Sequence, residues 1–493
     1  MHFATVTASR AAAAPDAPAV SDDVRSLSNR QFDDAVGQAA AVLRSRGIGA
    51  GDVVAVMLPN AVDFVVTLFA AWRLGATVTP VNPALGPREI GFQIADCSAA
   101  IIVTGSSFLE KIPDDVSTVT EILEQQHSEN GVVTEQLHRS ADDVALLIYT
   151  SGTTGRPKGV ILDHANLDAM SSMAIEAFSH NEASRSLLIL PLFHVNGIVI
   201  SVLAPLAAGG SVTILGRFDP RLFFERIEAV RPTYFSGVPT IFTMLANLPE
   251  SVRPDTSSVQ FAVCGAAPAS AELLERFEQR FGIPVVEGYG LSEATCASTV
   301  NPLNGVRKPG TVGPALPGQT VIVVDEQGAA IADGRPGEIL VKGPNVMRGY
   351  LGRPEETATT VVDGWLHTGD IGQLDIDGYL TLVDRAKDMI IRNGENIYPK
   401  EIENAAYQLD GVREVAVVGQ PHPVRGEEPV MFASLNPGTT ITADDIQTHL
   451  ADNLAKYKRP VTITITDEVP KNPVGKIDKP ALRRQLPATS PAS

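Results

Sequence analysis

The sequence predicts an α/β fold: a large N-terminal domain of doubly wound sheets with a small β subdomain, followed by a small, mobile α+β domain at the C-terminus. Short apolar segments typical of buried strands alternate with segments of helical periodicity through most of the chain, and such alternation favours parallel βαβ units. At 493 residues the chain is too long for one ordinary hydrophobic core. A charged run at residues 384–388 marks a credible linker between two domains.

The alternation begins in the N-terminal part of the chain. Apolar residues from Phe32 to Leu43 recur at helical spacing and predict a helix within residues 27–49. A second helix is predicted at 64–74, and apolar strands are predicted at 52–58, 76–80 and 100–103. These elements supply the first βαβ units of the predicted sheet.

The middle of the chain continues this pattern. The apolar run 144–148 predicts a buried strand, and residues 164–178 predict a helix. Further strands are predicted at 187–194, ending in Phe193 and His194, at 233–240 before a helix, and at 261–267. Because doubly wound sheets bind ligands at the carboxyl ends of their strands, these strand ends are candidates for a site.

The last third predicts two smaller units. Alternating segments at 321–324 and 337–342 indicate a small antiparallel or barrel subdomain that completes the large domain. Residues 389–403 predict a strand, a glycine turn and an amphipathic helix. Strands at 415–419, 430–435 and 461–465 and a helix at 443–454 complete a compact α+β domain.

Composition limits the partners and the compartment. The 39 basic and 57 acidic residues give a formal net charge of −18, which argues against nucleic acid or an anionic membrane as a general partner. Residues 1–20 lack the basic start and apolar core of a secretory signal, and no run of about 18 apolar residues predicts a membrane span. The three cysteines have no metal-ligand spacing, so we expect a cytoplasmic protein without a disulfide framework.

The segment 149–159, Tyr-Thr-Ser-Gly-Thr-Thr-Gly-Arg-Pro-Lys-Gly, carries the strongest functional signal. It combines three glycines, four Ser or Thr hydroxyls and a lysine directly after the buried strand. Glycines let backbone N–H groups approach an anion, the hydroxyls add neutral donors, and Lys158 adds positive charge. The spacing of glycine and lysine differs from the GxxxxGK[ST] loop, and a mobile surface turn is the alternative for such a segment. We predict a phosphate-binding loop.

This segment resembles the signature loop of the adenylate-forming superfamily, which includes acyl-CoA synthetases, the adenylation domains of peptide synthetases and beetle luciferases. Five motifs match the superfamily in the right order, and they extend over nearly the whole chain: 149–159, Phe193-His194, 284–293, 364–370 with Arg385, and 469–478. The resemblance is to an acyl-CoA-synthetase-like member. It implies ATP, Mg²⁺ and the co-substrate CoA.

The resemblance assigns nucleotide contacts to the large domain. Tyr289 would stack on adenine against a wall of small residues, and Glu293 would be an oxygen ligand of Mg²⁺, although alone it would be taken for a surface acid at a helix N-terminus. Ser292 stands where the superfamily usually has threonine, and it keeps the hydroxyl. The implied ATP-binding set is Thr150, Ser151, Gly152, Thr153, Thr154, Lys158, Gly265, Ala266, Ala267, Tyr289, Gly290, Ser292, Asp370 and Arg385, with the last two at the ribose.

The acid pocket is assigned around His194. Taken alone, one histidine at a strand end is more often a packed residue than a catalytic one; in the superfamily this histidine lines the acyl pocket and moves to open a thiol tunnel. The implied pocket comprises Phe193, Val195, Val238, Gly288, Thr295 and Cys296. Malonate-specific relatives carry an arginine at the position of Gly288, and amino-acid-activating relatives carry an aspartate soon after the aromatic residue. This chain has neither the arginine nor the aspartate. That difference predicts a substrate with a neutral tail, which is a medium- or long-chain fatty acid or an aryl acid.

The C-terminal motif implies the remaining roles. Segment 469–478 matches the catalytic-lysine motif, so Lys476 would bridge the carboxylate and the α-phosphate, although by itself such a lysine would be a mobile surface charge. The resemblance divides the chain into a large domain, 1–386, and a small domain, 387–493, with Lys387 as the hinge and Gly394 at the CoA tunnel. Asn393 replaces a usual glycine, and asparagine tolerates the left-handed region better than other side chains do.

The implied reaction has two half-reactions. A carboxylic acid and ATP give acyl-AMP and pyrophosphate, and CoA then gives acyl-CoA and AMP. The alternatives are a ligase that loads a carrier-protein phosphopantetheine or another nucleophile, a light-emitting oxygenase on the same fold, and a non-catalytic nucleotide-binding module. The last alternative predicts loss of Lys158, Glu293 or Lys476, and all three are present.

Overall fold

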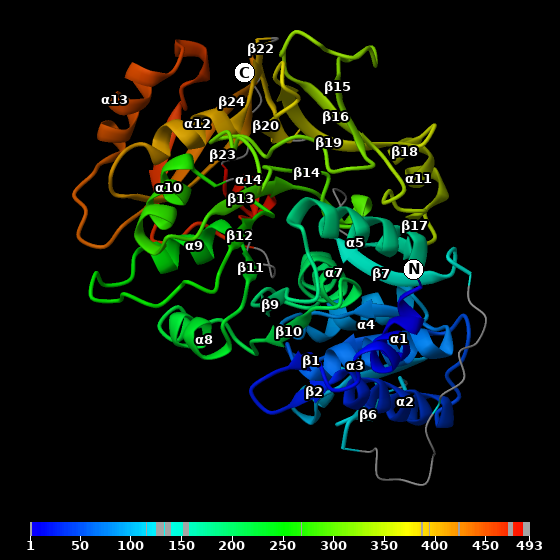
Figure 1. Ribbon diagram of the computed structural model, residues 1–493. Helices are drawn as coiled ribbons and strands as arrows, with labels where there is room; N and C mark the ends of the chain where they lie inside the picture. Colours follow the sequence, from blue (N-terminus) through cyan, green and yellow to red (C-terminus); the bar gives the residue numbers. More distant parts are fainter. Residues whose placement is uncertain are drawn as a thin grey trace. The chain divides into compact units, whose positions relative to one another are not determined.

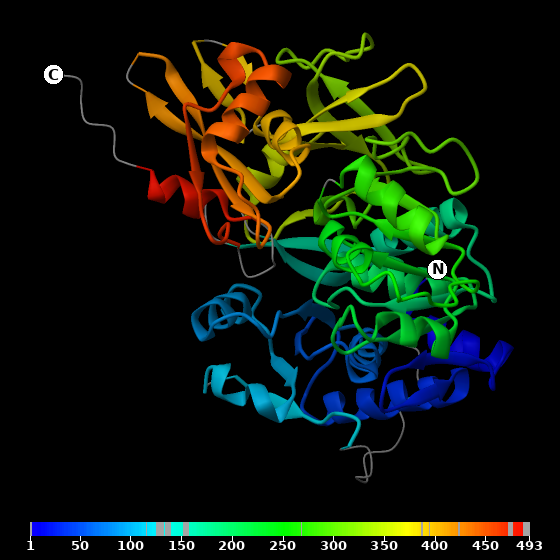
Figure 2. The same ribbon diagram turned by 90° about the vertical axis from the view of Figure 1, so that its left-hand side faces the viewer.

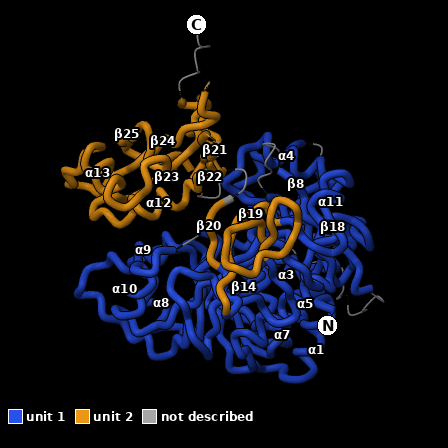
Figure 3. Tube along the Cα trace, turned by 90° about the horizontal axis from the view of Figure 1, so that it is seen from above, with its two compact units in different colours: residues 1–322, 340–367, 377–380 blue, residues 323–339, 368–376, 381–493 orange. Residues whose placement is uncertain are grey.

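The computed structural model in Figure 1 describes residues 2–114, 116–124, 133, 140–150, 157–267, 269–385, 388–393, 395–422, 424–471 and 477–486. The chain divides into two compact units, coloured separately in Figure 3. Unit 1 comprises residues 1–322, 340–367 and 377–380, and unit 2 comprises residues 323–339, 368–376 and 381–493. Large parallel sheets in unit 1 and a smaller α+β region at the end of the chain confirm the predicted fold class.

A seven-stranded sheet occupies the first half of unit 1, in the order β17-β8-β7-β4-β3-β5-β6. Strands β3 to β7 run parallel to their neighbours, whereas β8 is antiparallel to β7 and β17 is antiparallel to β8. The central strands are apolar and buried, as expected for parallel strands. The strands are β3 (Val53–Met57), β4 (Thr77–Pro80), β5 (Ile101–Thr104), β6 (Thr118–Thr120), β7 (Val144–Thr150), β8 (Lys158–Asp163) and β17 (Gly349–Tyr350).

Helices of the same half match the periodicity of the sequence. They are α1 (Val6–Ala13), α2 (Asn29–Ser45), α3 (Val62–Leu74), α4 (Pro87–Asp96) and α5 (His164–Phe178), and α2 and α3 pack against each other (Figure 1). A capping box begins α2, because Ser28 accepts from the Gln31 N–H and the Gln31 side chain accepts from the Ser28 N–H. Helix α3 ends at Gly75, whose φ of +76° is accessible to glycine at little cost.

An eight-stranded sheet forms the other half of unit 1, in the order β14-β13-β12-β11-β9-β10-β1-β2. Its six central strands are parallel, and the edge strands β2 and β14 are antiparallel. The strands are β1 (Pro18–Ser21), β2 (Ser26–Ser28), β9 (Arg185–Leu188), β10 (Ser211–Ile214), β11 (Tyr234–Gly237), β12 (Phe261–Cys264), β13 (Val285–Tyr289) and β14 (Thr299–Val300).

Phenylalanines fill the core beside this sheet. Phe223, Phe235, Phe242 and Phe277 are almost fully buried, and several of their rings meet edge to face, as aromatic pairs prefer. The accompanying helices are α8 (Phe223–Val230), α9 (Pro239–Ala246) and α10 (Ala271–Phe281). Residues 195–207 form one helical segment made of α6 (Val195–Ile198), a π-helical turn (Val199–Leu203) and α7 (Ala204–Ala207).

A third, five-stranded sheet has the order β15-β16-β19-β18, with β20 beside β19. It contains both segments that predicted a small β subdomain. Its strands are β15 (Thr320–Val324), β16 (Gly337–Lys342), β18 (Val361–Val362), β19 (Trp365–Leu374) and β20 (Leu380–Arg385). Helix α11 (Pro354–Thr360) precedes β18, and Pro354 occupies its first turn, where a missing N–H costs nothing.

The C-terminal part of unit 2 is built on a long hairpin. Strands β23 (Val412–His422) and β24 (Gly426–Leu435) pair antiparallel, with β21 (Ile390–Arg392), β22 (Glu395–Ile397) and β25 (Thr462–Ile465) completing the sheet. Helices α12 (Pro399–Tyr407) and α13 (Ala443–Asn453) pack Ile402, Ile446 and Leu450 onto this sheet. Helix α14 (Lys479–Gln485), red in Figure 2, packs Leu482 against β23. Within the described residues, no helix has the length and apolarity needed to cross a membrane.

Candidate functional site

The carboxyl ends of the parallel strands in the eight-stranded sheet gather most of the predicted site residues. Because β9, β11, β12 and β13 run in the same direction, the segments that follow them lie at one edge of the sheet. Four groups meet there: Phe193 and His194 after β9, Val238 after β11, Gly265 to Ala267 after β12, and Gly288 to Glu293 at the end of β13.

The strand predicted at 187–194 ends earlier than expected. Strand β9 stops at Leu188, and a turn carries the chain from Ile189 to His194. Pro191, three residues beyond the end of β9, could not have continued the sheet ladder, because it has no N–H. The His194 N–H closes the turn by donating to the Pro191 carbonyl at 3.1 Å. The Phe193 and His194 rings lie 4.6 Å apart between centroids.

Three residues in the segments after β12 and β13 have a strained backbone. Ala266, Thr295 and Cys296 have φ angles of +66°, +53° and +118°, a region that residues with a side chain rarely adopt. Strain of this kind persists where the surrounding structure fixes the backbone, and it clusters at binding sites. Gly290 is required by the same turn, since a Cβ there would lie 1.9 Å from the Cys296 carbonyl oxygen.

The predicted acid-pocket residues form an uncharged group. Burial raises the pKa of the Cys296 thiol to about 12, so the thiol stays neutral. Thr295 has 0% exposure and its hydroxyl donates to the Asn345 carbonyl at 2.6 Å, so its side chain supports the turn from beneath. A Cβ at Gly288 would lie 3.0 Å from the Thr299 carbonyl oxygen, which leaves little room for a larger residue on that face.

Glu293 lies beside Lys158, although one follows β13 and the other begins β8. The Tyr350 hydroxyl donates to Glu293 Oε1 at 2.9 Å, and Lys158 Nζ lies over the Tyr350 ring, 5.0 Å from its centroid. Lys158 also forms an ion pair with Glu356 on α11. Burial and the neighbouring Glu293 carboxylate raise the pKa of Tyr350, so its hydroxyl remains a donor.

One short segment joins these residues across the two large sheets. The Met347 N–H donates to the Glu293 carbonyl at 2.8 Å, and the Leu351 N–H donates to the Gly159 carbonyl at 2.8 Å. Between them, Tyr350 belongs to β17, which pairs with β8. The segment 345–351 therefore fixes the distance between Glu293 and the end of the predicted phosphate-binding loop.

Glu293 is chemically suited to a magnesium ion. Its carboxylate is half-buried, and the hydrogen bond from Tyr350 uses only part of its acceptor capacity. Within the described ranges no three His, Cys, Asp or Glu side chains form a metal-binding group. That arrangement fits Mg²⁺, which commonly takes one or two carboxylates and completes its shell with water and substrate phosphates.

Several predicted residues are described only in part or not at all. Thr150 ends β7 and Asp370 is buried in β19 of unit 2. Asn393 has a φ of +53°, which confirms that asparagine can hold the left-handed turn. The side chain of Arg385 lies outside the description. The residues Ser151, Gly152, Thr153, Thr154, Lys387, Gly394 and Lys476 lie outside the described part of the chain.

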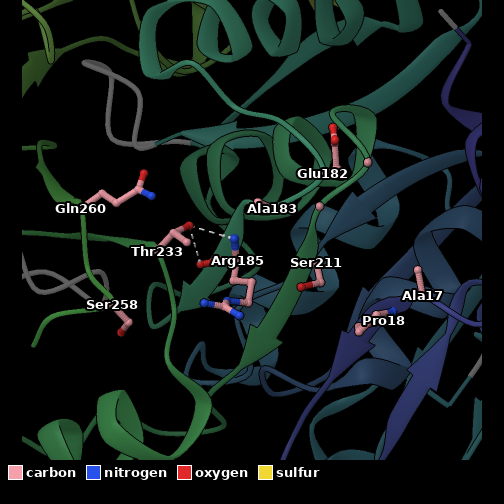
Figure 4. A pocket seen from close by; sticks show the side chains of 11 residues that line it. Ala17, Pro18, Glu182, Ala183, Arg185, Ser211, Thr233, Ser258 and Gln260 are labelled. Atoms are coloured by element: carbon pink, nitrogen blue, oxygen red, sulfur yellow. Dashed lines mark hydrogen bonds between the residues drawn. The ribbon is translucent and has the colours of Figure 1, made fainter. Parts of the chain in front are cut away.

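A cavity of about 380 Å³ lies elsewhere in unit 1 (Figure 4). It is lined by residues at the amino ends of the parallel strands, including Pro18 of β1, Arg185 of β9, Ser211 of β10 and Gln260 before β12. Ligands of this sheet class bind at the carboxyl ends. The cavity is therefore separate from the predicted site.

Sequence reasoning did not single out Tyr350, Glu356 or Asn345. Tyr350 and Glu356 are far from Lys158 in sequence, and nothing in their local pattern distinguishes them from ordinary residues of a strand and an exposed helix. The π-helical turn at Val199–Leu203 was also not predicted; such turns occur frequently at functional sites. Only the fold brings Tyr350 and Glu356 to Lys158, and Asn345 to Thr295.

The parallel α/β sheets, with candidate site residues at the carboxyl ends of their strands, are typical of nucleotide-binding α/β enzymes. Comparison with known families agrees. Residues 7–351 match the family described as AMP-binding enzyme, and residues 401–476 match the AMP-binding enzyme C-terminal domain. The chain belongs to this family, and so to the adenylate-forming superfamily.

Individual relatives agree over nearly full length. A feruloyl-CoA synthase of an Amycolatopsis species is 36% identical over 481 residues, covering 97% of both chains. A long-chain-fatty-acid–CoA ligase of Bacillus subtilis is 35% identical, covering 91% of this chain and 87% of that protein. The crystal structure of ATP-bound MatB from Rhodopseudomonas palustris superposes with a TM-score of 0.91 at 33% identity, covering 98% of this chain and 99% of that one.

These relationships establish the reaction class. The protein is an AMP-forming acid–thiol ligase that activates a small carboxylic acid with ATP and transfers the acyl group to CoA. ATP and CoA are its co-substrates, and Mg²⁺ is the metal standard for the family.

Proposed function

We propose that this ligase activates a monocarboxylic acid with a neutral tail, a medium- or long-chain fatty acid or an aryl acid. The observation that carries the proposal is that the predicted acid-pocket residues carry no charge. The Cys296 thiol is held neutral, the Thr295 hydroxyl donates to a backbone carbonyl, and Val195 is buried and apolar. A second carboxylate or an ammonium group on the substrate would be desolvated there without a partner.

Gly288 supports the same conclusion. A Cβ at this position would meet the Thr299 carbonyl oxygen at 3.0 Å and the Val300 side chain at 3.4 Å. A cationic side chain at residue 288 would therefore require β14 to move. Among the relatives, the names feruloyl-CoA synthase and long-chain-fatty-acid–CoA ligase agree with a neutral tail, whereas oxalate–CoA ligase and sulfoacetate–CoA ligase name acids with a second anionic group, so the acid panel must include both kinds.

We assign the residue roles by resemblance to the superfamily. Lys158 and the amides of segment 151–156 would hold the triphosphate, and Glu293 would ligate Mg²⁺, which when bound neutralises phosphate charge. Tyr289, with Gly265 to Ala267, would hold the adenine, while Asp370 and Arg385 would bind the ribose. His194 would close the acid site. The protein thus supplies orientation and charge neutralisation, which is most of what phosphoryl chemistry requires.

The second half-reaction would use the C-terminal domain. We assign residues 387–493 to that domain, with Lys387 as the hinge, Lys476 as the lysine at the carboxylate and α-phosphate, and Gly394 at the CoA tunnel. The match of residues 401–476 to the family's C-terminal domain supports this assignment. In this role Lys476 would act electrostatically on the carboxylate and the α-phosphate. Its replacement by alanine should therefore lower the adenylation rate about 10²- to 10³-fold.

The test is ATP–pyrophosphate exchange over a panel of fatty, aryl, dicarboxylic and amino acids, with wild type and Lys476→Ala. We expect exchange with one neutral-tailed class, loss of exchange in the variant, and thioester formation when CoA is added. Exchange driven only by dicarboxylic or amino acids would refute the neutral-tail proposal. Exchange that CoA does not convert to thioester would indicate a carrier-protein thiol or another acceptor.

A further inference from the structure

Lys158 has a protein carboxylate as its partner. Its ammonium group pairs with Glu356 of α11, and it also lies over the ring of Tyr350. Lys158 is 13% exposed at the side chain and Glu356 is 38% exposed, so water reaches the pair mainly from the Glu356 side. The contact is strong enough to orient the lysine and weak enough to exchange for another anion.

The position of Glu356 is fixed by the fold. Arg353, at the start of α11, pairs with Asp96 at 3.2 Å, and Asp96 also accepts from the Tyr149 hydroxyl at 2.7 Å. At the other side of the turn, the Tyr350 N–H donates to Thr357 Oγ1 at 2.9 Å. These contacts attach α11 to β7 and β17, the strands beside Lys158.

Charge at this point is unfavourable for a polyphosphate. Lys158 contributes one positive charge, whereas Glu293 and Glu356 contribute two negative charges around the same tyrosine. Both carboxylates act on the Tyr350 hydroxyl. An incoming phosphate must therefore compete with the Glu356 carboxylate for the single positive charge of Lys158.

We propose that Glu356 is a positioning residue that competes with nucleotide phosphates for Lys158. The inference rests on the phosphate-binding role proposed above for Lys158. Glu356 holds the ammonium group at the phosphate site, gives it up when ATP binds, and pairs with it again as pyrophosphate leaves. The competition weakens binding of ATP and pyrophosphate alike, so product release is faster than it would be with an unpaired lysine.

The test is equilibrium binding of pyrophosphate, ATP and AMP, each with Mg²⁺, to Glu356→Gln. Glu355→Gln is the matched control: it removes the same charge from the same helix turn, and among the described residues no ion pair involves Glu355. We expect Glu356→Gln to bind pyrophosphate and ATP about two- to five-fold more tightly than wild type, the size of a partly exposed ion pair. Glu355→Gln should match wild type.

Two further measurements identify the cause. The gain should shrink as ionic strength rises from about 0.05 to 0.5 M, because salt screens a partly exposed pair. It should also vanish in a Lys158→Met background, as a double-mutant cycle requires if Glu356 acts through Lys158. Thermal unfolding of each variant checks that the fold is retained, and stronger product inhibition of Glu356→Gln by pyrophosphate is the kinetic counterpart.

The outcomes separate this inference from the proposed function. If Lys158→Met weakens pyrophosphate binding but Glu356→Gln binds no more tightly than wild type, the competition is refuted and the role of Lys158 stands. If Glu356→Gln and Glu355→Gln tighten binding equally, the effect is general charge and the inference is refuted. If Lys158→Met leaves pyrophosphate binding unchanged, both the inference and the proposed role of Lys158 are wrong.

Discussion

Acidification should destabilise unit 1 through His180, which follows α5. The side chain is buried, with its ring 4.6 Å from that of Tyr234 and its Nε2 atom without a hydrogen-bond partner among the described residues. Burial lowers the pKa of His180 from 6.5 to about 4. The folded chain therefore excludes a proton that the unfolded chain binds below pH 6.5.

The sign and the size follow from linkage. Between pH 6.5 and about 4 the unfolded state binds more protons than the folded state, so stability falls as the pH falls through this window. Each pH unit is worth about 1.4 kcal/mol for one group. Acidification to pH 5 should therefore cost about 2 kcal/mol from His180 alone.

His180→Phe removes the titrating ring and keeps an aromatic side chain of similar shape. Urea unfolding at pH 7.5 and 5.0, followed by tryptophan fluorescence, suits the test because both tryptophans, Trp72 and Trp365, lie in unit 1. Other titrating groups are shared by the two proteins and cancel in the comparison. Wild type should lose about 2 kcal/mol more than His180→Phe on acidification. Equal losses would refute the argument from burial.

Three other predictions concern the strand ends. Tyr350→Phe removes the hydrogen bond to Glu293 and should raise the Mg²⁺ concentration for half-maximal pyrophosphate exchange about 10-fold; an unchanged Mg²⁺ dependence would contradict this role. Gly290→Ala should lower the free energy of unfolding by about 3 kcal/mol or more, because its Cβ would meet the Cys296 carbonyl at 1.9 Å. Gly265→Ala is the control, because its Cβ would lie 3.4 Å from the Gly288 carbonyl oxygen, and its free energy of unfolding should equal that of wild type. Equal losses of unfolding free energy in Gly290→Ala and Gly265→Ala would rule out the steric explanation. A thiol reagent at pH 7.5 should label no cysteine in the folded chain and all three in urea. Burial keeps the reagent away from the thiols of Cys97, Cys264 and Cys296 and also raises their pKa values.

Much of the fold follows from local pattern. The helix predicted at 164–178 is α5 with the same bounds, and the helix predicted at 443–454 is α13 to within one residue. Hydrophobic periodicity and capping residues act over a few turns, so they are visible in a single segment. The strand predicted at 187–194 was wrong at its end, because β9 stops at Leu188 although the apolar run continues, and Pro191 within that run cannot join a sheet ladder.

The antiparallel strand β8 shows the limit of that reasoning. Alternation of strands and helices predicts parallel pairing, yet β8 returns directly beside β7, with Lys158 opposite Thr150. Pairing direction depends on the loop between two strands, and segment 151–157 is short enough for a hairpin. The motif in this loop indicated phosphate binding; it did not indicate that the loop joins a hairpin.

Some residues of the candidate site can be predicted from sequence, whereas others are visible only in the structure. Residues within a recognisable motif, such as His194 and Tyr289, can be singled out from sequence because the motif resembles one of a known superfamily. Tyr350 and Glu356 cannot, because their roles arise from contacts with Lys158 and Glu293, which lie far away in the chain. Local pattern predicts which side chains have suitable chemistry, whereas long-range pairing decides which of them meet.

The hydrogen bonds of segment 345–351 connect Glu293, after the eight-stranded sheet, to Lys158 and Gly159 in the seven-stranded sheet. Glu293 is held through its backbone by Met347 and through its side chain by Tyr350. Tyr350 also contacts Lys158, and Leu351 binds the carbonyl of Gly159 next to it. A shift of this segment would therefore move Glu293 and Lys158, the proposed metal ligand and the proposed phosphate-binding residue, together. The distance between the two groups is thus set by one continuous backbone rather than by two independent loops, which is the preorganisation that electrostatic catalysis requires.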